Sequence, residues 1–191
     1  QTGSFVWSGG TISGASSATL NALNIDTNTT KLLDTATLNL SGAGTWTGNS
    51  GLGMTEGAIF NIQNGATFDV RTNATIVLGA GAAPAINNAG TYKKTAGGGA
   101  SAIAAGIDFT NTGTVSAGNG TLTFEGSFTQ TRGAAGLAGG GISWQSVLNF
   151  SGGELRGAGT IAGNVSNTGA TVRPGGTGAA GSGGATGGTA T

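Results

Sequence analysis

Two groups of carboxylates and arginines are the first candidates for chemistry in this sequence. Glu125 and Glu154 are separated along the chain by an interval that could place them on adjacent turns of a repeating fold, and Arg156 follows Glu154 at the alternate position. Glycoside hydrolysis requires two carboxyl groups within roughly 5 to 9.5 Å of each other, so the two glutamates would have to meet there. Asp69 and Arg71 form a similar pair. The simpler interpretation is ion pairing on a solvated sheet, and we expect the protein not to be an enzyme.

Two further motifs are similar to binding loops but lack residues that binding requires. A G-x-G-x-x-G string begins at Gly176, yet no acidic residue follows it and the surrounding segment has low complexity. Residues 26–30 begin like a calcium loop, but Lys31 stands where an EF-hand needs glycine and Thr37 stands where it needs glutamate. We therefore expect neither a cofactor nor a bound metal ion.

The composition excludes most other chemistry. The chain has 191 residues, no histidine, no cysteine, seven basic and seven acidic side chains, and a formal net charge of zero. This removes histidine-based triads, cysteine nucleophiles, ordinary zinc sites and disulfide scaffolds. Lys93 and Lys94 are the only adjacent cations, so we expect no nucleic-acid binding. The longest apolar stretch, 74–86, is interrupted by glycine and proline, so we expect no membrane insertion.

Aromatic side chains offer one possible binding surface. Trp7, Trp46, Trp144 and Tyr92 could form a platform on which sugar rings stack. They are spread thinly along the chain, so core positions are the simpler expectation. Trp7 alternates with Phe5, which places both on one face of a strand and favours the core. For Trp46, which stands between two threonines, buried and exposed positions both stay open.

Threonines recur in pairs at alternate positions. The pairs resemble the threonine arrays that ice-binding β-solenoids present, although their spacing here is uneven. High β-propensity on exposed strands is the ordinary explanation, and ice binding is a minor alternative. The pairs are Thr35/Thr37, Thr45/Thr47, Thr112/Thr114, Thr121/Thr123 and Thr129/Thr131.

The elements that must position these residues are short strands. Helical periodicity is absent, while runs of four or five residues alternate between apolar and polar side chains. In residues 37–40, for example, Leu38 and Leu40 share one face and Asn39 lies on the other. Similar runs occupy the segments 59–63, 67–71 and 121–125. Each run predicts a strand with one buried face.

A corner signal of asparagine followed by glycine recurs between these strands. Both residue types tolerate the left-handed backbone that a tight corner uses. The first three asparagines are almost evenly spaced, and the fourth follows after more than twice that interval. We interpret the glycine- and alanine-rich residues 132–141 as a bulged loop that interrupts the repeat. The predicted corner and ladder residues are Asn64 with Gly65, Asn88 with Gly90, Asn111 with Gly113, and Asn167 with Gly169.

A period in the twenties predicts an all-β fold, a parallel β-helix or β-solenoid of about eight short coils. A β-sandwich of antiparallel hairpins is the alternative. We expect residues 1–176 to form the solenoid and residues 177–191 to form a tail rich in glycine, alanine and threonine. The tail's composition is typical of a flexible linker, but we hypothesise that it packs along its own solenoid or on a neighbouring molecule.

Several segments resemble the Gly/Thr/Asn-rich repeats of giant secreted bacterial surface proteins, including autotransporter passengers and haemagglutinin-like exoproteins. The segments are FVWSGGTISG (5–14), LNLSGAGTWTG (38–48), INNAGTYKKTAG (86–97), FTNTGTVSAGNGTLTFEGSF (109–128) and LNFSGGELRGAGTIAGNVSNTG (148–169). The resemblance implies a right-handed parallel β-helix that extends from the cell as an adhesin or fibre. It also implies an extracellular or bacterial cell-surface location.

These observations lead us to expect a structural or adhesive extracellular module, either a stalk or a filament-forming subunit of a bacterial surface fibre. We expect it to self-associate into fibres or to continue in a longer chain, with a host or glycan surface as a possible ligand. The alternative is a β-helix that binds or degrades polysaccharide. In the first case the stacked coils would carry load through continuous backbone ladders, with asparagine and threonine rows pairing with their copies in the next coil.

Overall fold

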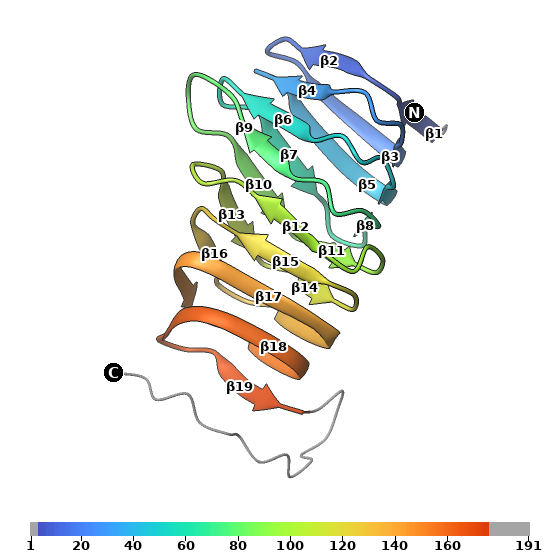
Figure 1. The fold of residues 1–191 in the computed structure, drawn as a ribbon. Helices are drawn as coiled ribbons and strands as arrows, with labels where there is room; N and C mark the ends of the chain where they lie inside the picture. Colours follow the sequence, from blue (N-terminus) through green and yellow to red (C-terminus); the bar gives the residue numbers. More distant parts are fainter. Residues whose placement is uncertain (1–3, 176–191) are drawn as a thin grey trace.

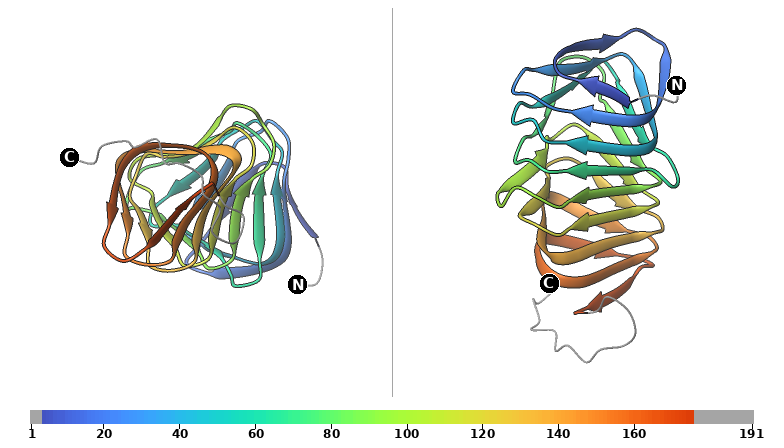
Figure 2. Two further views of the ribbon diagram at one scale, coloured as in Figure 1. Left: turned by 90° about the horizontal axis from the view of Figure 1, so that it is seen from below. Right: turned by 90° about the vertical axis from the view of Figure 1, so that its right-hand side faces the viewer.

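The computed structural model describes residues 4–175, which form a rod of parallel β-strands wound into about eight stacked coils (Figures 1 and 2). All strand pairings within this range are parallel, and each strand pairs with the equivalent strand one coil later. The prediction of a parallel β-solenoid is confirmed, and the antiparallel β-sandwich is wrong. Among these residues there is no helix with the length and apolar character needed to cross a membrane. The predicted tail and the G-x-G-x-x-G string at Gly176 lie outside the described residues.

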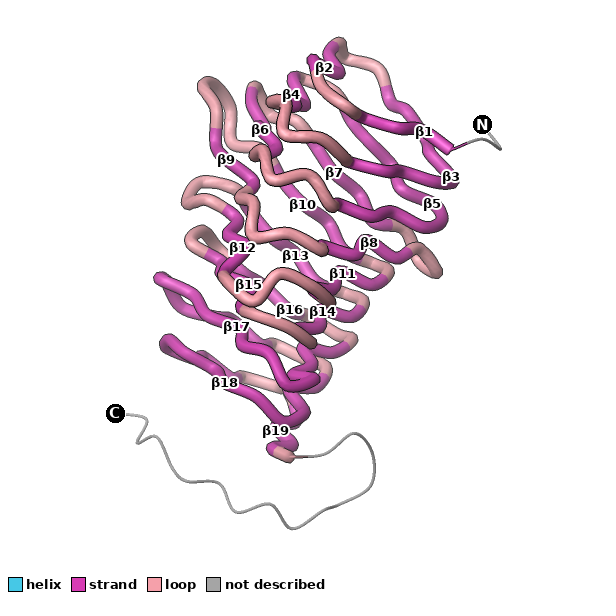
Figure 3. Tube along the Cα trace, turned by 45° about the vertical axis from the view of Figure 1, so that its right-hand side comes forward, coloured by secondary structure: helices cyan, strands magenta, loops and turns pink. Residues whose placement is uncertain are grey.

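Each complete coil contributes one strand, or one part of a longer strand, to each of three sides of the rod, which we name faces A, B and C (Figure 3). The longer strands join the three faces into one 19-stranded sheet. Face A contains β1 (Ser4–Trp7), the second half of β3 (Ser17–Ile25), the second half of β5 (Thr37–Trp46), β8 (Thr67–Val70), β11 (Thr91–Lys94), β14 (Thr114–Ala117), the start of β17 (Ala134–Phe150), the start of β18 (Glu154–Asn167) and β19 (Thr171–Pro174).

Face B contains β2 (Gly10–Ser13), β4 (Lys31–Asp34), β6 (Leu52–Thr55), β9 (Ile76–Leu78), β12 (Ala100–Ile103), β15 (Thr121–Phe124) and the middle parts of β17 and β18. Face C contains the first halves of β3 and β5, then β7 (Ile59–Ile62), β10 (Ala85–Asn88), β13 (Asp108–Asn111), β16 (Phe128–Gln130) and the ends of β17 and β18. The A–B, B–C and C–A corners join the faces in chain order.

We number the coils from the face A strand with which each begins. Coils 1 to 3 begin in β1, β3 and β5, and coils 4 to 8 begin at β8, β11, β14, β17 and β18. β19 starts a ninth coil. In coils 7 and 8 a single long strand bends around all three faces, as the two orange ribbons of Figure 1 show.

Coil length varies because the corners vary while the strands do not. A residue and its partner in the next coil are 18 positions apart at the start, 27 in the middle and 17 at the end, as shown by the pairs Ser4–Ala22, Ile76–Ile103 and Glu154–Thr171. The B–C corner, for example, occupies residues 35–36 in coil 2 but residues 79–84 in coil 4. The first three predicted corner asparagines are nearly evenly spaced in the sequence, but the repeat itself has no fixed length.

The glycine-rich segment 132–141 is not the predicted bulged loop. β17 begins at Ala134 and continues through the segment, with Ala134, Ala135 and Leu137 buried. The irregularity is a register shift between Ala138 and Gly141 against β18, which bends the strand at the A–B corner. Glycine is tolerated here because the segment pairs with strands on both sides, so its backbone is fixed by hydrogen bonds and not by side-chain packing.

The core consists of columns of side chains, each covered above and below by its equivalents. On face C, Leu38, Phe60, Ile86, Phe109 and Phe128 follow one another in register, and all are buried. The rings of Phe109 and Phe128 are stacked with centroids 5.5 Å apart. Because each coil covers the next, a chain with few apolar residues still buries most of those it has.

Corner glycines allow neighbouring coils to approach closely. A Cβ atom on Gly113 would collide with the carbonyl oxygen of Gly90 in the preceding coil, and one on Gly90 would collide with the carbonyl oxygen of Ala66. Neither glycine has a positive φ, whereas Gly65 has a φ of 82°. The left-handed backbone therefore explains Gly65, while contact between stacked backbones explains Gly90 and Gly113.

We expect Gly113→Ala to lower the free energy of unfolding by about 1 to 3 kcal/mol, because the added carbon has to displace a backbone carbonyl. Gly136→Ala is the matched control, since its Cβ would find nothing closer than the Val115 carbonyl oxygen at 3.6 Å. We expect it to change the unfolding free energy by less than about 0.5 kcal/mol. Urea unfolding measures both variants, and equal losses would contradict the close-approach explanation.

Candidate functional site

A row of asparagines crosses three coils on the outer surface of face C. Asn61 donates from Nδ2 to Oδ1 of Asn39 at 2.7 Å, and Asn87 donates to Oδ1 of Asn61 at 2.9 Å. Asn39 in turn donates to Oγ of Ser17 at 2.7 Å. The alternation of residues 37–40 places Asn39 on the outer face, but its partners follow only from the register. We call this row the outer ladder.

A second row of amides lies inside the solenoid, at the ends of the face C strands. Asn88 donates from Nδ2 to Oδ1 of Asn111 at 2.8 Å, and Asn111 donates to Oε1 of Gln130 at 2.9 Å. Each of these three side chains is at most 1% exposed. We call this row the inner ladder.

The inner ladder also binds the backbone of the C–A corner. Asn88 donates to the carbonyl oxygen of Thr114 at 2.9 Å, and Gln130 donates to that of Glu154 at 3.1 Å. In each case the acceptor is the first face A residue of the coil that lies two coils further along the chain than the donor. The amides therefore satisfy carbonyl groups that face the interior where the chain turns from face C to face A.

The inner ladder begins at Asn88 because the equivalent position one coil earlier is apolar. The register pairs Asn88 with Ile62, and Ile62 with Leu40. Oδ1 of Asn88 is buried without a hydrogen-bond donor, as expected at the first rung of a row in which each amide donates to the next. This orphan acceptor belongs to the ladder and does not point to a ligand.

The predicted corner asparagines fall into different environments. Asn88 and Asn111 are rungs of the inner ladder, at the ends of β10 and β13. Asn64 lies two residues beyond Ile62, the partner of Asn88, and is exposed in a turn with Gly65. The corner is two residues longer in that coil, so equal spacing along the sequence does not give equal position in the coil.

Asn167 stabilises its own corner. Its Oδ1 accepts hydrogen bonds from the backbone N–H groups of Gly169 at 3.2 Å and Ala170 at 2.7 Å, and the side chain is exposed. A Cβ atom on Gly169 would lie 2.5 Å from the carbonyl oxygen of Ser151, so this glycine also serves close stacking. The register continues from Gln130 through Phe150 to Asn167, so the long interval before Asn167 contains regular coils.

The aromatic side chains form no platform for sugar rings. Trp7, Trp46, Trp144 and Tyr92 are all buried, so the core position expected for Trp7 is confirmed and Trp46 is also in the core. The indole N–H of Trp144 donates to the carbonyl oxygen of Asn164 at 2.6 Å. The four residues therefore stabilise the stack and present no ring face to solvent.

Glu125 and Glu154 do not meet. Glu125 follows β15 at the B–C corner of coil 6, whereas Glu154 begins β18 on face A of coil 8. The expectation that they could lie on adjacent coils is wrong, because the coils are shorter here than that expectation requires. Glu154 instead accepts a hydrogen bond from Arg156 at 3.2 Å and lies 3.7 Å from Nε of Arg173.

Asp69 and Arg71 form the expected ion pair, but the expectation that both lie on a solvated face is wrong for Asp69, whose side chain is buried. Nε of Arg71 lies 2.8 Å from Oδ2 of Asp69, and Thr95 Oγ1 donates to the other carboxylate oxygen at 2.7 Å. The Asp69 side chain is only 4% exposed, while that of Arg71 is half exposed. The carboxylate is therefore fully engaged in structural contacts and has no free oxygen directed at a substrate.

Lys94 lies inside the solenoid, although its neighbour Lys93 points outward. Its side chain is fully buried, and Nζ donates to the carbonyl oxygens of Thr72 and, at 2.8 Å, Ala96. It also lies 3.3 Å from Oδ1 of Asn73. These acceptors belong to two successive A–B corners, so one ammonium group joins the corners of coils 4 and 5. The alternation of Lys94 with buried Tyr92 is the sequence signal for this position.

Lys31 is the buried cation of an earlier A–B corner, but the acceptors of its ammonium group all belong to that one corner. Its buried Nζ donates to the carbonyl oxygen of Thr29 at 2.7 Å and to that of Thr27 at 3.2 Å. These oxygens come from the segment 26–30, which begins like a calcium loop in the sequence. The ammonium group is thus the cation that these backbone oxygens contact. Within residues 4–175 no three carboxylates gather into a metal-binding cluster.

Burial perturbs both lysines. Removal from water lowers the pKa of the Lys31 and Lys94 ammonium groups, and the nearby Asp26 carboxylate opposes this effect on the pKa of Lys31. Burial likewise raises the pKa of the Tyr92 hydroxyl. The hydrogen bonds to corner carbonyls show that both lysines serve the fold.

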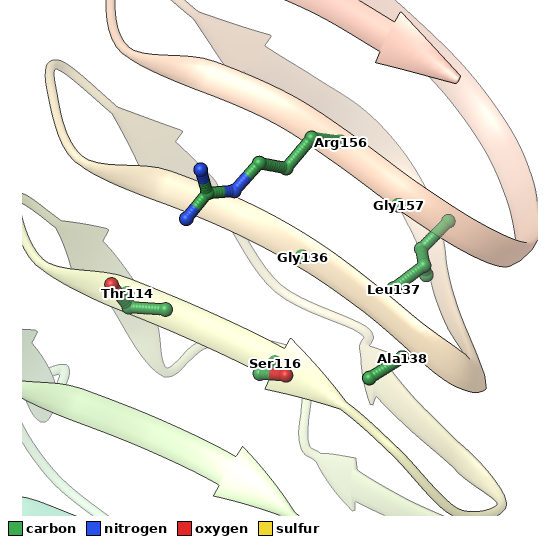
Figure 4. A pocket seen from close by; sticks show the side chains of 7 residues that line it. All are labelled: Thr114, Ser116, Gly136, Leu137, Ala138, Arg156 and Gly157. Atoms are coloured by element: carbon green, nitrogen blue, oxygen red, sulfur yellow. The ribbon is translucent and has the colours of Figure 1, made fainter. Parts of the chain in front are cut away.

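Hollows open at several places on the surface of the rod. A polar hollow of about 390 Å³ runs along the C–A corner, lined by Asn64, Gly65, Ala66, Ala89, Gly90, Thr91, Thr112, Gly113, Thr114 and Gly133. A depression of about 170 Å³ lies on face A, where Gly136 leaves a gap between Ser116 and Arg156 (Figure 4). Another, of about 130 Å³, opens at the carboxy-terminal end beside Ile161 and Val172. We call these the corner hollow, the face A depression and the end hollow.

The threonine pairs do not share one surface. Thr45 lies on face A, Thr121 and Thr123 on face B, and Thr129 on face C. The regular threonine column of the structure is instead Thr67, Thr91 and Thr114, which follow one another in register on face A. The paired threonines are therefore spread around the rod and form no single flat array.

Comparison with known proteins gives no match. No family model, no curated protein and no solved structure matches the chain. The likeness to secreted bacterial surface repeats therefore stays a resemblance, and function has to be inferred from the geometry of the rod itself.

We expect Asn111→Ala to lower the free energy of unfolding by about 2 to 4 kcal/mol, because it removes one hydrogen-bond partner from each of two buried amides and one from a buried corner carbonyl. Asn61→Ala in the outer ladder should cost less than about 1 kcal/mol, since water can reach the groups it frees. Urea unfolding followed by circular dichroism compares the two variants. A loss for Asn61→Ala as large as that for Asn111→Ala would refute the structural role of the inner ladder.

The buried lysines should give the protein a pH-dependent stability. The folded state releases the Lys31 and Lys94 protons at lower pH than the unfolded chain, so the unfolded state binds more protons between the lowered pKa and about 10.5. The free energy of unfolding therefore rises with pH in that window, until ionisation of tyrosine in the unfolded chain, near pH 10, begins to oppose the rise.

A Lys31→Met/Lys94→Met double variant should lose this rise, and Lys93→Met should keep it. Urea unfolding at a series of pH values between about 7 and about 10 measures the slope directly. An unchanged slope in the double variant would show that the buried ammonium groups do not titrate in this window.

Proposed function

We propose that this chain is a structural module of an extracellular bacterial surface fibre, serving as a stalk, an adhesin segment or a filament-forming subunit. The proposal rests on a rod whose coils repeat without a catalytic constellation among residues 4–175. It also rests on the resemblance of five segments to the repeats of secreted surface proteins. In this role the protein transmits load along the rod and presents surfaces at its sides and ends.

The exposure of interior positions at the carboxy-terminal end of the rod is the main support for the proposal. Val165 and Val172 occupy interior positions, because the register pairs them with the buried Leu148 and Leu155. In the last described coils, however, Val165 is 41% exposed, Val172 is 49% exposed and Ile161 is 36% exposed. Among residues 4–175, β19 is the last strand of the stack on face A, and no strand follows β18 on faces B and C. An interior layer open to solvent favours the addition of another coil.

The amino-terminal end offers the other half of such a contact. The strands of coil 1 pair with coil 2 on one edge only, and no other strand among the described residues pairs with the opposite edge. The indole of Trp7 lies over this end of the core and donates to the carbonyl oxygen of Gly10 at 3.3 Å. Open strand edges recruit further strands, so an end-to-end contact between two rods would continue the three backbone ladders.

Glycan binding is a second candidate because of the corner hollow. Its lining is mostly polar, and Thr91 and Thr114, which are partners in successive coils, place their hydroxyl groups along it, with Thr112 beside Thr114 at the same corner. Hydroxyl and backbone groups in such a row suit the hydroxyl groups of an extended polysaccharide. Binding there would make the rod an adhesin toward a glycan surface without any catalytic step.

We expect the full chain to form end-to-end filaments at high concentration, and an Ile161→Asn/Val165→Asn double variant to form few or none. The two changes place polar groups in the open interior layer, where a further coil would have to bury them. Negative-stain electron microscopy and sedimentation velocity measure filament length. Val147→Asn is the matched control, since Val147 is similarly exposed but lies on the outer surface of face C.

Filaments of equal length from the double variant would contradict the end-to-end contact. A wild-type sample that stays as short monodisperse rods and depletes a neutral polysaccharide from solution would replace the fibre module with the glycan-binding candidate. Filaments that shorten only in the double variant, and not in Val147→Asn, are the outcome that the proposal requires.

A further inference from the structure

The charges of the chain are separated around the rod, although they sum to zero. Two of the seven cations are buried, and the other five lie on face A or at the two corners that border it. Two acids, Asp69 and Glu154, lie on the same face and pair with arginines there. The five accessible cations are Arg71, Lys93, Arg132, Arg156 and Arg173.

Four of the other five acids lie at the B–C corner, which is the one corner that face A does not border. They are Asp34 at the end of β4, Glu56 and Glu125 directly after β6 and β15, and Asp108 at the start of β13. All four are exposed or half-buried, and the fifth acid, Asp26, lies at an A–B corner near Lys31. The rod therefore has a cationic face and an acidic edge on opposite sides.

The two charged surfaces have the same spacing along the rod. The acids of the B–C corner belong to coils 2, 3, 5 and 6. The cations of face A belong to coils 4 and 5, to the corner that leads into coil 7, and to coils 8 and 9. A shift of two coils brings every acid level with a cation, giving the pairs Asp34 with Arg71, Glu56 with Lys93, Asp108 with Arg132, and Glu125 with Arg156.

We propose that copies of this chain pack side by side, with the acidic B–C edge of one rod against cationic face A of the next. Both rods have the rung spacing of a β-sheet, about 4.8 Å, so the match persists over the whole contact. The contact joins unlike surfaces, so each rod keeps one free face and one free edge, and further copies can add to form a lateral array. The spacing of the four pairs is the same when read from either end of the rod. The charges therefore determine which surfaces meet and at what height, but not whether the two rods run parallel or antiparallel.

The shapes of the two surfaces agree with this contact. The acidic edge carries its longest corner, residues 79–84, in coil 4, and residues 79–83 of it are exposed. The same two-coil shift places this corner level with coil 6 of the neighbour. There the face A depression begins, with Ser116 on one side and the bare backbone of Gly136 as its floor (Figure 4). A small-residue loop can enter a depression that lacks a side chain.

A second copy fits face A better than an anionic polymer does. Glu154 interrupts the cations, and a uniform polyanion would meet its carboxylate, whereas a neighbour presents only four acids at fixed heights. Each exposed pair contributes little by itself, so the contact between two short rods is weak. It strengthens when the rods are long, because many pairs then act together. The proposal therefore rests on the proposed role as a fibre module.

The test uses the Ile161→Asn/Val165→Asn background, which removes end-to-end contacts and leaves every charge in place. In that background we compare Lys93→Glu/Arg156→Glu, which reverses face A, with Glu56→Lys/Glu125→Lys, which reverses the acidic edge. Sedimentation velocity and light scattering measure association at low salt and high protein concentration, where even the weak contact between two short rods is detectable. Thermal unfolding of each variant checks that the rod remains folded.

We expect the background protein to associate at low salt and each reversed variant to remain monomeric. An equimolar mixture of the two reversed variants should associate again, because each supplies the complement of the other. Raising sodium chloride from about 0.01 M to about 1 M shortens the Debye length from roughly 30 Å to roughly 3 Å and should weaken association by at least about tenfold. Thr129→Lys on face C is the control for a charge added elsewhere, and it should associate like the background.

A background protein that is monomeric at low salt would overturn the lateral contact while leaving the end-to-end filaments to be judged on their own. The lateral contact would also be overturned if both reversed variants still associate. It would likewise be overturned if mixing the two reversed variants fails to restore association. The proposal is also wrong if the protein never self-associates, while face A binds polygalacturonate and loses this binding in Lys93→Glu/Arg156→Glu. That result would make an anionic polysaccharide the ligand of the cationic face.

Discussion

The structure depends on the distance between stacked backbones. Each coil donates and accepts peptide hydrogen bonds with its neighbours, which holds the chains at the spacing of a β-sheet, about 4.8 Å. Any side chain at a corner has to fit within that spacing, and glycine appears at Gly90 and Gly113 because a Cβ atom would meet the carbonyl oxygen of the coil before. The same spacing lets a chain with few apolar residues build a core, since every inward side chain is covered by its equivalents.

Stacking also decides what the polar side chains do. A residue that faces inward without being apolar has to find a partner in the next coil or in a corner, as the inner ladder and the ammonium group of Lys94 do. A residue that faces outward joins a row along the rod, as in the outer ladder. Function in such a molecule resides in rows, edges and ends. Among the described residues, the cationic face, the acidic edge and the open carboxy-terminal layer are the features that remain accessible to a second molecule.

The strands could be predicted because alternation is a local pattern. The register between coils could not be predicted, since the corners differ in length. Residues 37–40 and the burial of Trp7 follow from the period of two. The register pairs Asn88 with Ile62 and not with Asn64, since one corner is two residues longer than the next. The glycine-rich start of β17 has almost no alternation to detect, so its place as a rung emerges only from its neighbours. Lys94 is found by alternation with Tyr92, provided that charge is not taken as proof of exposure.

Glycine-rich segments are full rungs of the stack, and every other feature of the rod follows from that. Residue-resolved amide hydrogen exchange tests this directly, because exchange reports whether a backbone N–H is bonded in a stable ladder. We expect the amides of β17 from Ala134 to Ser143, apart from those at the A–B corner, to be protected as strongly as those of β14 and β15, with which they pair. Exchange of β17 at the rate of an unfolded chain, while its neighbours remain protected, would show that the segment is not a rung.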